Sequence, residues 1–111
     1  MGTGAGVDTL TLLFTDLVGS TEALVGLSED RFDPVRDEHD ALVGGTIAPH
    51  RGELVERTGD ASMAVFRRAG EAIAAAAEIQ RVISKRNEGS EVALGVRVVI
   101  SAGDVLEQAG A

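Results

Sequence analysis

The chain has 111 residues and a formal net charge of −8, with three Phe and no Trp, Tyr or Cys. This length suits one domain with a packed core, and the acidity argues against nucleic acid or an anionic membrane as a partner. The lack of cysteine excludes disulfides and thiolate metal sites and favours a cytoplasmic location. No apolar run reaches the length needed to span a membrane.

The first predicted strand covers residues 8–15, after a glycine-rich stretch at residues 1–7 that we expect to be a disordered tail. The side chains of this strand are apolar or β-prone, as in a buried strand. We expect the strand to end at Asp16. A tight turn at Gly19 and a short helix over residues 20–27 are predicted to follow.

This strand–turn–helix segment has the composition of a metal–nucleotide site. A carboxylate at the end of a strand is a hard oxygen ligand suited to Mg²⁺, and the free backbone N–H groups of a helix N-terminus suit a phosphate. The same composition is also typical of a plain strand–helix connection, with Ser20 or Gly19 as the N-cap. Both interpretations are open at this point.

A second helical segment follows, and its start is open between Asp33–Pro34 and a first turn that begins at Ser28. Pro49 marks its end. His39 and His50 do not have the spacing of a recognised metal site, so we expect surface or capping roles for them. The apolar positions that keep helical spacing in this segment are Phe32, Val35, Leu42, Val43 and Ile47.

Residues 53–58 and 62–66 are two short β runs, joined by a Gly-Asp-Ala connection that is typical of a hairpin. The alanine-rich run over residues 69–86 is predicted to be a helix, with Gly89 just past its end. The predicted apolar face of this helix consists of Ala72, Ile73, Ala76, Ile79, Val82 and Ile83.

The last predicted strand begins at Leu94, where apolar and mixed side chains alternate up to Ser101. We expect a turn at Gly103–Asp104 and a C-terminal tail over residues 106–111. The sequence contains no internal repeat and no linker, so residues 8–105 are predicted to form one domain.

These elements occur in the order β, α, α, β, β, α, β. This is the ferredoxin-like arrangement with an extra helix, an α/β (α+β) sandwich with helices on one face of an antiparallel-dominated sheet. Right-handed crossovers make the first two strands parallel, with the third strand between them. The end of the first strand and the hairpin then lie at the same edge, so we expect Asp16 and Asp60 to converge. Two carboxylates there can hold divalent metal against a triphosphate.

Several segments of the chain, taken together, are typical of one family. They are FTDLVGST, PHRG, TGD, the alanine-rich run that ends in IQR, and the Gly-Asp-Val after the last strand. With these segments the chain resembles, from about Leu10 to Val105, the class III adenylyl/guanylyl cyclase catalytic domain of the actinobacterial type. The resemblance implies conversion of ATP or GTP to the 3′,5′-cyclic nucleotide and pyrophosphate, in intracellular signalling.

The resemblance also implies a set of site residues. Mg²⁺ or Mn²⁺ would lie between Asp16 and Asp60, with the backbone carbonyl of Leu17 as a further ligand. The phosphate-binding turn would fall on Val18, Gly19, Ser20 and Thr21. Active sites of this family form in a head-to-tail dimer, so the resemblance implies a homodimer or a cyclase-like partner chain.

The chain departs from the family pattern at the hairpin. Glu56 stands where the family commonly has a base-recognising lysine, and a carboxylate cannot donate a hydrogen bond to a base. Arg57 is adjacent, but neighbouring strand residues point to opposite faces. Ala61 replaces a glycine and would be strained at positive φ. Ser62 stands where a large apolar residue is common.

No segment matches the later part of the family pattern, which carries a second base-recognising residue and the Asn and Arg that stabilise the transition state. Loss of one such group typically costs about 100- to 1,000-fold in rate. Two hypotheses follow. The chain is a cyclase whose missing groups come from another chain or are dispensable, or it is a non-catalytic nucleotide-binding or dimerisation module. We expect little or no activity from the isolated chain.

Overall fold

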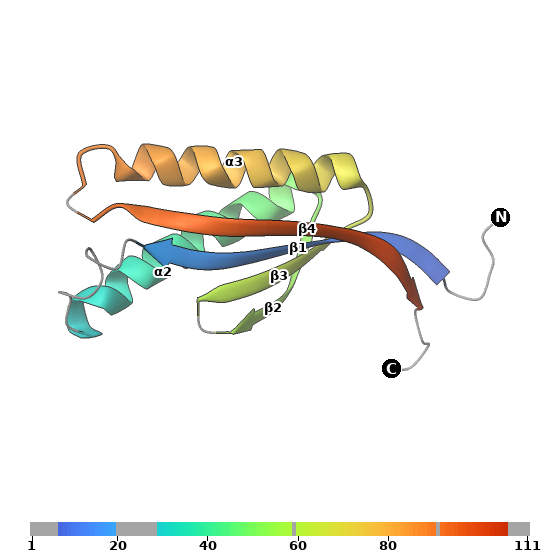
Figure 1. Cartoon of the computed structure of the whole chain (residues 1–111), viewed down its shortest axis with the longest axis horizontal. Helices are drawn as coiled ribbons and strands as arrows, with labels where there is room; N and C mark the ends of the chain where they lie inside the picture. The colour runs from blue at the N-terminus through green and yellow to red at the C-terminus, as the bar shows by residue number, and fades with distance from the viewer. Residues whose placement is uncertain (1–6, 20–28, 59, 91, 107–111) are drawn as a thin grey trace.

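The computed structural model describes residues 7–19, 29–58, 60–90 and 92–106 (Figure 1). The predicted helix over residues 20–27 lies outside them. No helix within these ranges is both long enough and apolar enough to cross a membrane. In chain order the elements are β1 (Val7–Gly19), α2 (Glu29–Ile47), the 3₁₀ turn η1 (Ala48–His50), β2 (Glu53–Thr58), β3 (Ala61–Phe66), α3 (Ala69–Asn87) and β4 (Leu94–Leu106).

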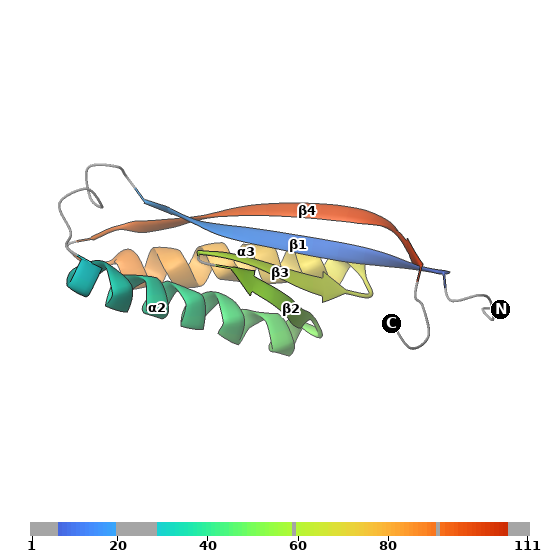
Figure 2. The same ribbon diagram turned by 90° about the horizontal axis from the view of Figure 1, so that it is seen from below.

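The four strands form one antiparallel sheet in the order β2-β3-β1-β4. β3 lies between β1 and β2, which run parallel to each other, as the predicted crossovers require. Both α2 and α3 lie on one face of the sheet (Figure 2). We call the opposite face, which neither of these helices covers, the open face. The predicted ferredoxin-like α/β arrangement is confirmed.

β1 runs past the position predicted for its end. Asp16 lies within the strand, which continues to Gly19 and pairs there with Leu94 of β4. Gly95 permits this close approach, because a Cβ at that position would lie only 3.0 Å from the carbonyl oxygen of Val18. The prediction that Asp16 closes the strand is therefore wrong. The long β4 offers hydrogen-bonding partners that the local sequence of β1 does not reveal.

The turn predicted at Gly103–Asp104 is also wrong, because both residues lie in β4 opposite Leu10 and Thr9. The pairing of β1 with β3 begins only at Thr11. The residues of β1 before Thr11 therefore pair with β4 and not with β3. The resulting two-stranded end extends past α3 (Figure 1). β1 and β4 each run one residue beyond the predicted domain of residues 8–105.

The core lies between the sheet and the two helices. In β1 the alternating side chains of Leu13, Thr15 and Leu17 are buried toward the helices. Ile73, predicted on the apolar face of α3, is 59% exposed. That prediction is wrong because Ile73 lies roughly 100° around the helix from the buried Ala72. The buried stripe of α3 consists of Ala72, Ala75, Ile79 and Ile83.

α2 begins at Glu29, close to the earlier of its two predicted starts, with Pro34 inside the helix. His39 is 1% exposed, so the surface or capping role predicted for it is wrong. It lies on the stripe of α2 that faces the core. His50 has the predicted capping role, because its Nδ1 donates to the carbonyl oxygen of Thr46 at 2.9 Å.

Gly52 joins η1 to β2 and marks a point where the core leaves no room. A Cβ there would lie 2.5 Å from two ring atoms of the buried Phe66 and 2.9 Å from Cγ2 of Ile47. We expect Gly52→Ala to lower the free energy of unfolding by about 1–3 kcal/mol, as overpacked core substitutions do. Urea denaturation followed by circular dichroism measures this change.

Gly45→Ala is the matched control. Gly45 is exposed in α2, and a Cβ there would meet no atom within 4 Å. This substitution is expected to raise the free energy of unfolding by about 0.5–1 kcal/mol, because alanine loses less backbone entropy than glycine on folding. Equal effects of the two substitutions would show that the space around Gly52 is not the cause.

Candidate functional site

Asp16 and Asp60 are brought side by side by the pairing of β1 with β3. Asp16 lies opposite Ala61, the residue after Asp60. The backbone N–H of Leu17 donates to the carbonyl oxygen of Asp60 at 3.2 Å. The side chains of the two aspartates are 49% and 36% exposed. The predicted convergence is therefore present in the backbone, and both carboxylates are accessible.

Asp16 faces the open side of the sheet. Its neighbours Thr15 and Leu17 are buried toward the helices, and side chains alternate along a strand. The residue opposite Asp16 in β4 is Arg97, whose Nη1 lies 3.9 Å from Oδ2 of Asp16. A guanidinium therefore shares the open face with this carboxylate.

Asp60 has an arginine neighbour from the helical layer. Nε of Arg36, on α2, lies 3.9 Å from Oδ1 of Asp60. Nη2 of Arg36 donates to Oδ1 of Asp33 in the same helix at 3.1 Å. Neither Arg36 nor Arg97 was expected at the site from the sequence. The β1–β4 register identifies Arg97 once the strand pairing is known, whereas no local pattern marks Arg36.

The donor atoms at this end of the sheet fit a hard divalent cation. Two carboxylates come from neighbouring backbone positions, and Mg²⁺ is commonly bound by one or two carboxylates together with water and phosphate oxygens. Among the residues that the structure describes, no group of three or more His, Cys, Asp or Glu is placed to hold a metal ion. Two carboxylates would leave the remaining coordination positions of such an ion to phosphate or water oxygens.

The predicted phosphate-binding turn lies partly within the described residues. Val18 and Gly19 belong to β1 and pair with β4, so the turn does not begin at Val18 as expected. The reason is the extension of the β1–β4 ladder. Ser20 and Thr21 lie outside the described residues. The phosphate-binding role of these four residues, and the metal-binding role of the Leu17 carbonyl, stay predictions.

Glu56 lines a cavity of about 180 Å³ beside the aspartates. Phe14 pairs with Met63 in the strand register, and Asp16 pairs with Ala61, so the cavity opens on the same face as Asp16. The other residues that line the cavity are Phe14, Thr58, Ala61, Ser62 and Met63. The position predicted for base recognition thus lies next to the aspartates, with a mostly apolar wall and one carboxylate.

A bulge in β2 decides which side chain faces this cavity. The register of β2 against β3 shifts between Leu54 and Glu56, so that Glu56 lies opposite Met63 and Arg57 lies opposite Ser62. Nη2 of Arg57 donates to the carbonyl oxygen of Asp40 in α2 at 3.4 Å. The prediction that Glu56 and Arg57 point to opposite faces is confirmed.

The departures from the family pattern at Ala61 and Ser62 have simple structural explanations. Ala61 lies in β3 and does not have positive φ; in the described part of the chain, Arg51 is the non-glycine residue that does. The Ser62 hydroxyl forms a hydrogen bond with Oγ1 of the buried Thr15 across the two strands. The polar residue at position 62 therefore satisfies a buried polar neighbour directly beside Asp16.

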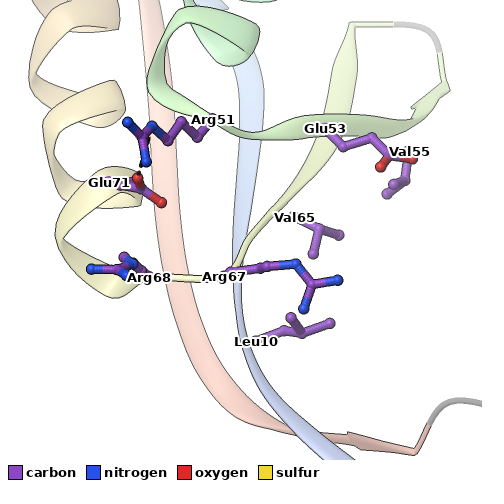
Figure 3. A pocket seen from close by; sticks show the side chains of 8 residues that line it. All are labelled: Leu10, Arg51, Glu53, Val55, Val65, Arg67, Arg68 and Glu71. Carbon is purple, nitrogen blue, oxygen red and sulfur yellow. Dashed lines mark ion pairs between the residues drawn. The ribbon is translucent and has the colours of Figure 1, made fainter. Parts of the chain in front are cut away.

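A larger cavity, of about 380 Å³, lies at the opposite end of β1 and β3 (Figure 3). Nε of Arg51 is 3.7 Å from Oε2 of Glu71 there, and Glu53 lines the same cavity. Figure 3 shows Arg67 and Arg68 pointing away from each other. Because its charges are mixed and its arginines diverge, this cavity does not present a uniformly positive surface to an anion. The aspartate end of the sheet is therefore the stronger candidate site.

Comparison with known proteins gives the fold a family context. No protein-family model matches the chain. The chain is 32% identical over 99 residues to serine/threonine-protein kinase pkn2 of Myxococcus xanthus, a match that covers 87% of this chain and 12% of that protein. The chain thus spans only a small part of this curated relative, and the kinase activity in that protein's name belongs to the whole protein.

Solved structures similar to the chain are nucleotide cyclases. A bacterial light-regulated adenylyl cyclase is 18% identical with a TM-score of 0.80, over 94% of this chain and 58% of that one. The adenylate/guanylate cyclase/hydrolase from Silicibacter pomeroyi is 26% identical with a TM-score of 0.74, over 96% and 63%. The guanylyl cyclase Cya2 is 22% identical with a TM-score of 0.74, over 92% and 57%.

The chain spans about three fifths of the length of these three structures. Because the matches cover at least 92% of this chain, they include most of its four-stranded sheet and of the two helices. The actinobacterial subtype stays a prediction. The chain therefore has the fold of the class III adenylyl and guanylyl cyclase catalytic domains, as its motifs predicted.

Proposed function

We propose that this domain binds a nucleoside triphosphate together with Mg²⁺ or Mn²⁺ at Asp16 and Asp60. The observation that carries the proposal is the hydrogen bond from Leu17 N–H to the Asp60 carbonyl, because it fixes the two aspartates at adjacent backbone positions. The divalent ion would supply the positive charge that binds and polarises the phosphates. Arg97, whose Nη1 lies 3.9 Å from Asp16 Oδ2 on the same face, would pair with a phosphate oxygen.

The reaction that this binding serves is formation of a 3′,5′-cyclic nucleotide with release of pyrophosphate. The chain matches about three fifths of its cyclase neighbours, and its sequence offers no counterpart to the family's later Asn and Arg. We therefore expect slow or no turnover by this chain alone. A partner chain that supplies these groups would restore turnover. Because its substrates would be cellular triphosphates, the proposal includes a cytoplasmic location for this domain.

Glu56 gives the cavity beside the aspartates a preference among bases. Guanine presents two donors side by side, N1–H and the 2-amino group, which a single carboxylate can accept. Adenine presents its 6-amino donor next to the N1 acceptor, which a carboxylate does not satisfy. Because Glu56 lines this cavity, we expect GTP to bind more tightly than ATP, although the lysine contact of the family is lost.

A second candidate function, a dimerisation module, is favoured by the apolar side chains on the open face. Phe14, Val55 and Val99 are 38%, 44% and 51% exposed, and Phe14 pairs with Val99 across the strands. Exposed apolar residues that lie together mark an interaction surface. The match to a small part of a protein kinase supports this alternative, since there a similar segment lies within a protein named for another activity.

The metal site is tested by removing one carboxylate at a time. We expect Asp16→Asn and Asp60→Asn each to weaken Mn²⁺-dependent GTP binding by at least roughly tenfold. Loss of an outer-shell partner of a metal site already lowers metal affinity by about this factor, and these residues would be direct ligands. Isothermal titration calorimetry with Mn²⁺–GTP measures this. Asp37→Asn, an exposed residue of α2, changes the net charge equally and should have no effect. Unchanged affinity in both site variants would refute the metal site.

The base preference is tested by Glu56→Gln. The amide keeps the shape of the side chain but loses the charge, so the preference for GTP over ATP should fall roughly tenfold, the worth of a hydrogen bond to a charged group. Competition binding of the two triphosphates in Mn²⁺ buffer measures the ratio. The products are assayed in the same samples, and fast cyclic nucleotide formation by the wild-type chain would contradict the expected lack of turnover.

The dimerisation alternative predicts that charge on the open face separates the subunits. We expect the wild-type chain to self-associate at high concentration and Val99→Lys to shift it to the monomer, because a lysine would have to be desolvated in the interface. Sedimentation velocity measures both. Ile73→Lys, equally apolar and exposed but on α3, should leave association unchanged. A strictly monomeric wild-type chain would count against the module.

A further inference from the structure

Each aspartate of the candidate site has an arginine neighbour, and the two arginines come from different layers. Arg97 reaches Asp16 from β4 on the open face, and Arg36 reaches Asp60 from α2 in the helical layer, both at 3.9 Å. Two guanidiniums thus match two carboxylates at this end of the sheet, on a chain whose formal net charge is −8. The sequence motifs do not predict the pairing of Arg36 with Asp60.

Arg36 serves two carboxylates at once. Its Nη2 donates to Oδ1 of Asp33 at 3.1 Å, and its Nε lies 3.9 Å from Oδ1 of Asp60. A guanidinium presents several donors in one plane, so one side chain can address both acids. Asp33, one turn earlier in α2, thereby helps to hold Arg36 beside the hairpin. The Arg36 side chain is 34% exposed, so its charge is partly shielded from solvent.

A divalent ion bound to Asp60 would lie within range of this guanidinium. Like charges at such distances repel, and more strongly near a protein surface than in bulk water. Arg36 therefore lowers the affinity of the site for a free ion. A triphosphate brings negative charge that offsets both the ion and the arginine. Arg36 thus affects free metal and the metal–triphosphate complex differently.

We propose that Arg36 is a specificity-determining counter-cation of the site. It neutralises Asp60 in the free protein and makes the site select a metal ion already bound to a triphosphate over the free ion. The inference rests on the proposed function, because it requires Asp60 to bind the metal. Arg36 acts through Asp60 and through charge, so it is a positioning residue that need not touch the base or the sugar.

The test compares wild type with Arg36→Gln in two titrations, one with Mn²⁺ alone and one with Mn²⁺–GTP. We expect Arg36→Gln to bind free Mn²⁺ roughly three- to tenfold more tightly, the range that a nearby charge gives at a partly exposed site. Affinity for Mn²⁺–GTP should stay the same or fall. Calorimetry or the electron paramagnetic resonance signal of free Mn²⁺ gives both values without any turnover.

Two further substitutions separate the charge of Arg36 from its structural role. Arg36→Lys keeps the charge and should keep the wild-type affinity for free Mn²⁺. Arg81→Gln removes a matched arginine, which forms an ion pair with Glu78 three residues earlier on α3, and should leave both affinities unchanged. Circular dichroism confirms the fold of each variant. If Arg36→Gln does not fold, Arg36→Lys and Arg36→Met against wild type give the same comparison.

The outcomes distinguish failure of the inference from failure of the proposed function. If Asp60→Asn loses Mn²⁺ binding but Arg36→Gln matches wild type for free Mn²⁺, the role of Arg36 is refuted and the metal site stands. If Asp60→Asn binds Mn²⁺ as wild type does, Asp60 is not a metal ligand and the inference fails with that part of the proposed function. Tighter binding of free Mn²⁺ in Arg36→Gln, but not in Arg81→Gln, supports the inference.

Discussion

The register of β1 against β3 is the constraint on which the candidate site depends. It sets Thr15 opposite Ser62 and Asp16 opposite Ala61. A slip of one residue would turn Asp16 toward the helices and bring the buried Leu17 onto the open face. Burial of alternate β1 side chains against α3, together with the Thr15–Ser62 hydrogen bond, opposes such a slip. The packing of the core therefore also sets the position of the carboxylates.

Much of this fold could be predicted from the sequence because its signals are local. The hairpin of β2 and β3 was found from two short β runs around Gly-Asp-Ala, and α3 from its alanine-rich periodicity. The position of β3 between β1 and β2 followed from the order of the elements and the handedness of their crossovers. The errors concern partners that lie far away in the chain. β1 and β4 are both longer than predicted because each extends the other, and Ile73 is exposed because the core favours a slightly rotated face of α3.

The same distinction applies to the candidate site. Asp16 lies in the FTDLVGST motif and Asp60 in the TGD motif, so their convergence could be predicted once the topology was inferred. Arg36 and Arg97 could not, because an arginine in a helix or strand is typical of any solvated surface. Their proximity to the aspartates arises from tertiary packing. The burial of His39 could not be predicted either. It depends on the rotation of α2 about its axis, which the sequence pattern defines only loosely.

The bulge in β2 has a consequence for how such a site can change. If Val55 did not bulge and the register of Glu53 and Leu54 continued unbroken, Glu56 would lie opposite Ser62 and Arg57 opposite Ala61. The alternation of side chains would then set Arg57 toward the cavity and Glu56 toward α2. The group offered to a bound base would then be a donor of hydrogen bonds instead of an acceptor. In this fold the position of one bulge can therefore decide the polarity of a recognition surface while every amino acid is conserved. A bulge that moves along β2 is thus a route to new ligand preference that requires no change in the residues that face the cavity and α2.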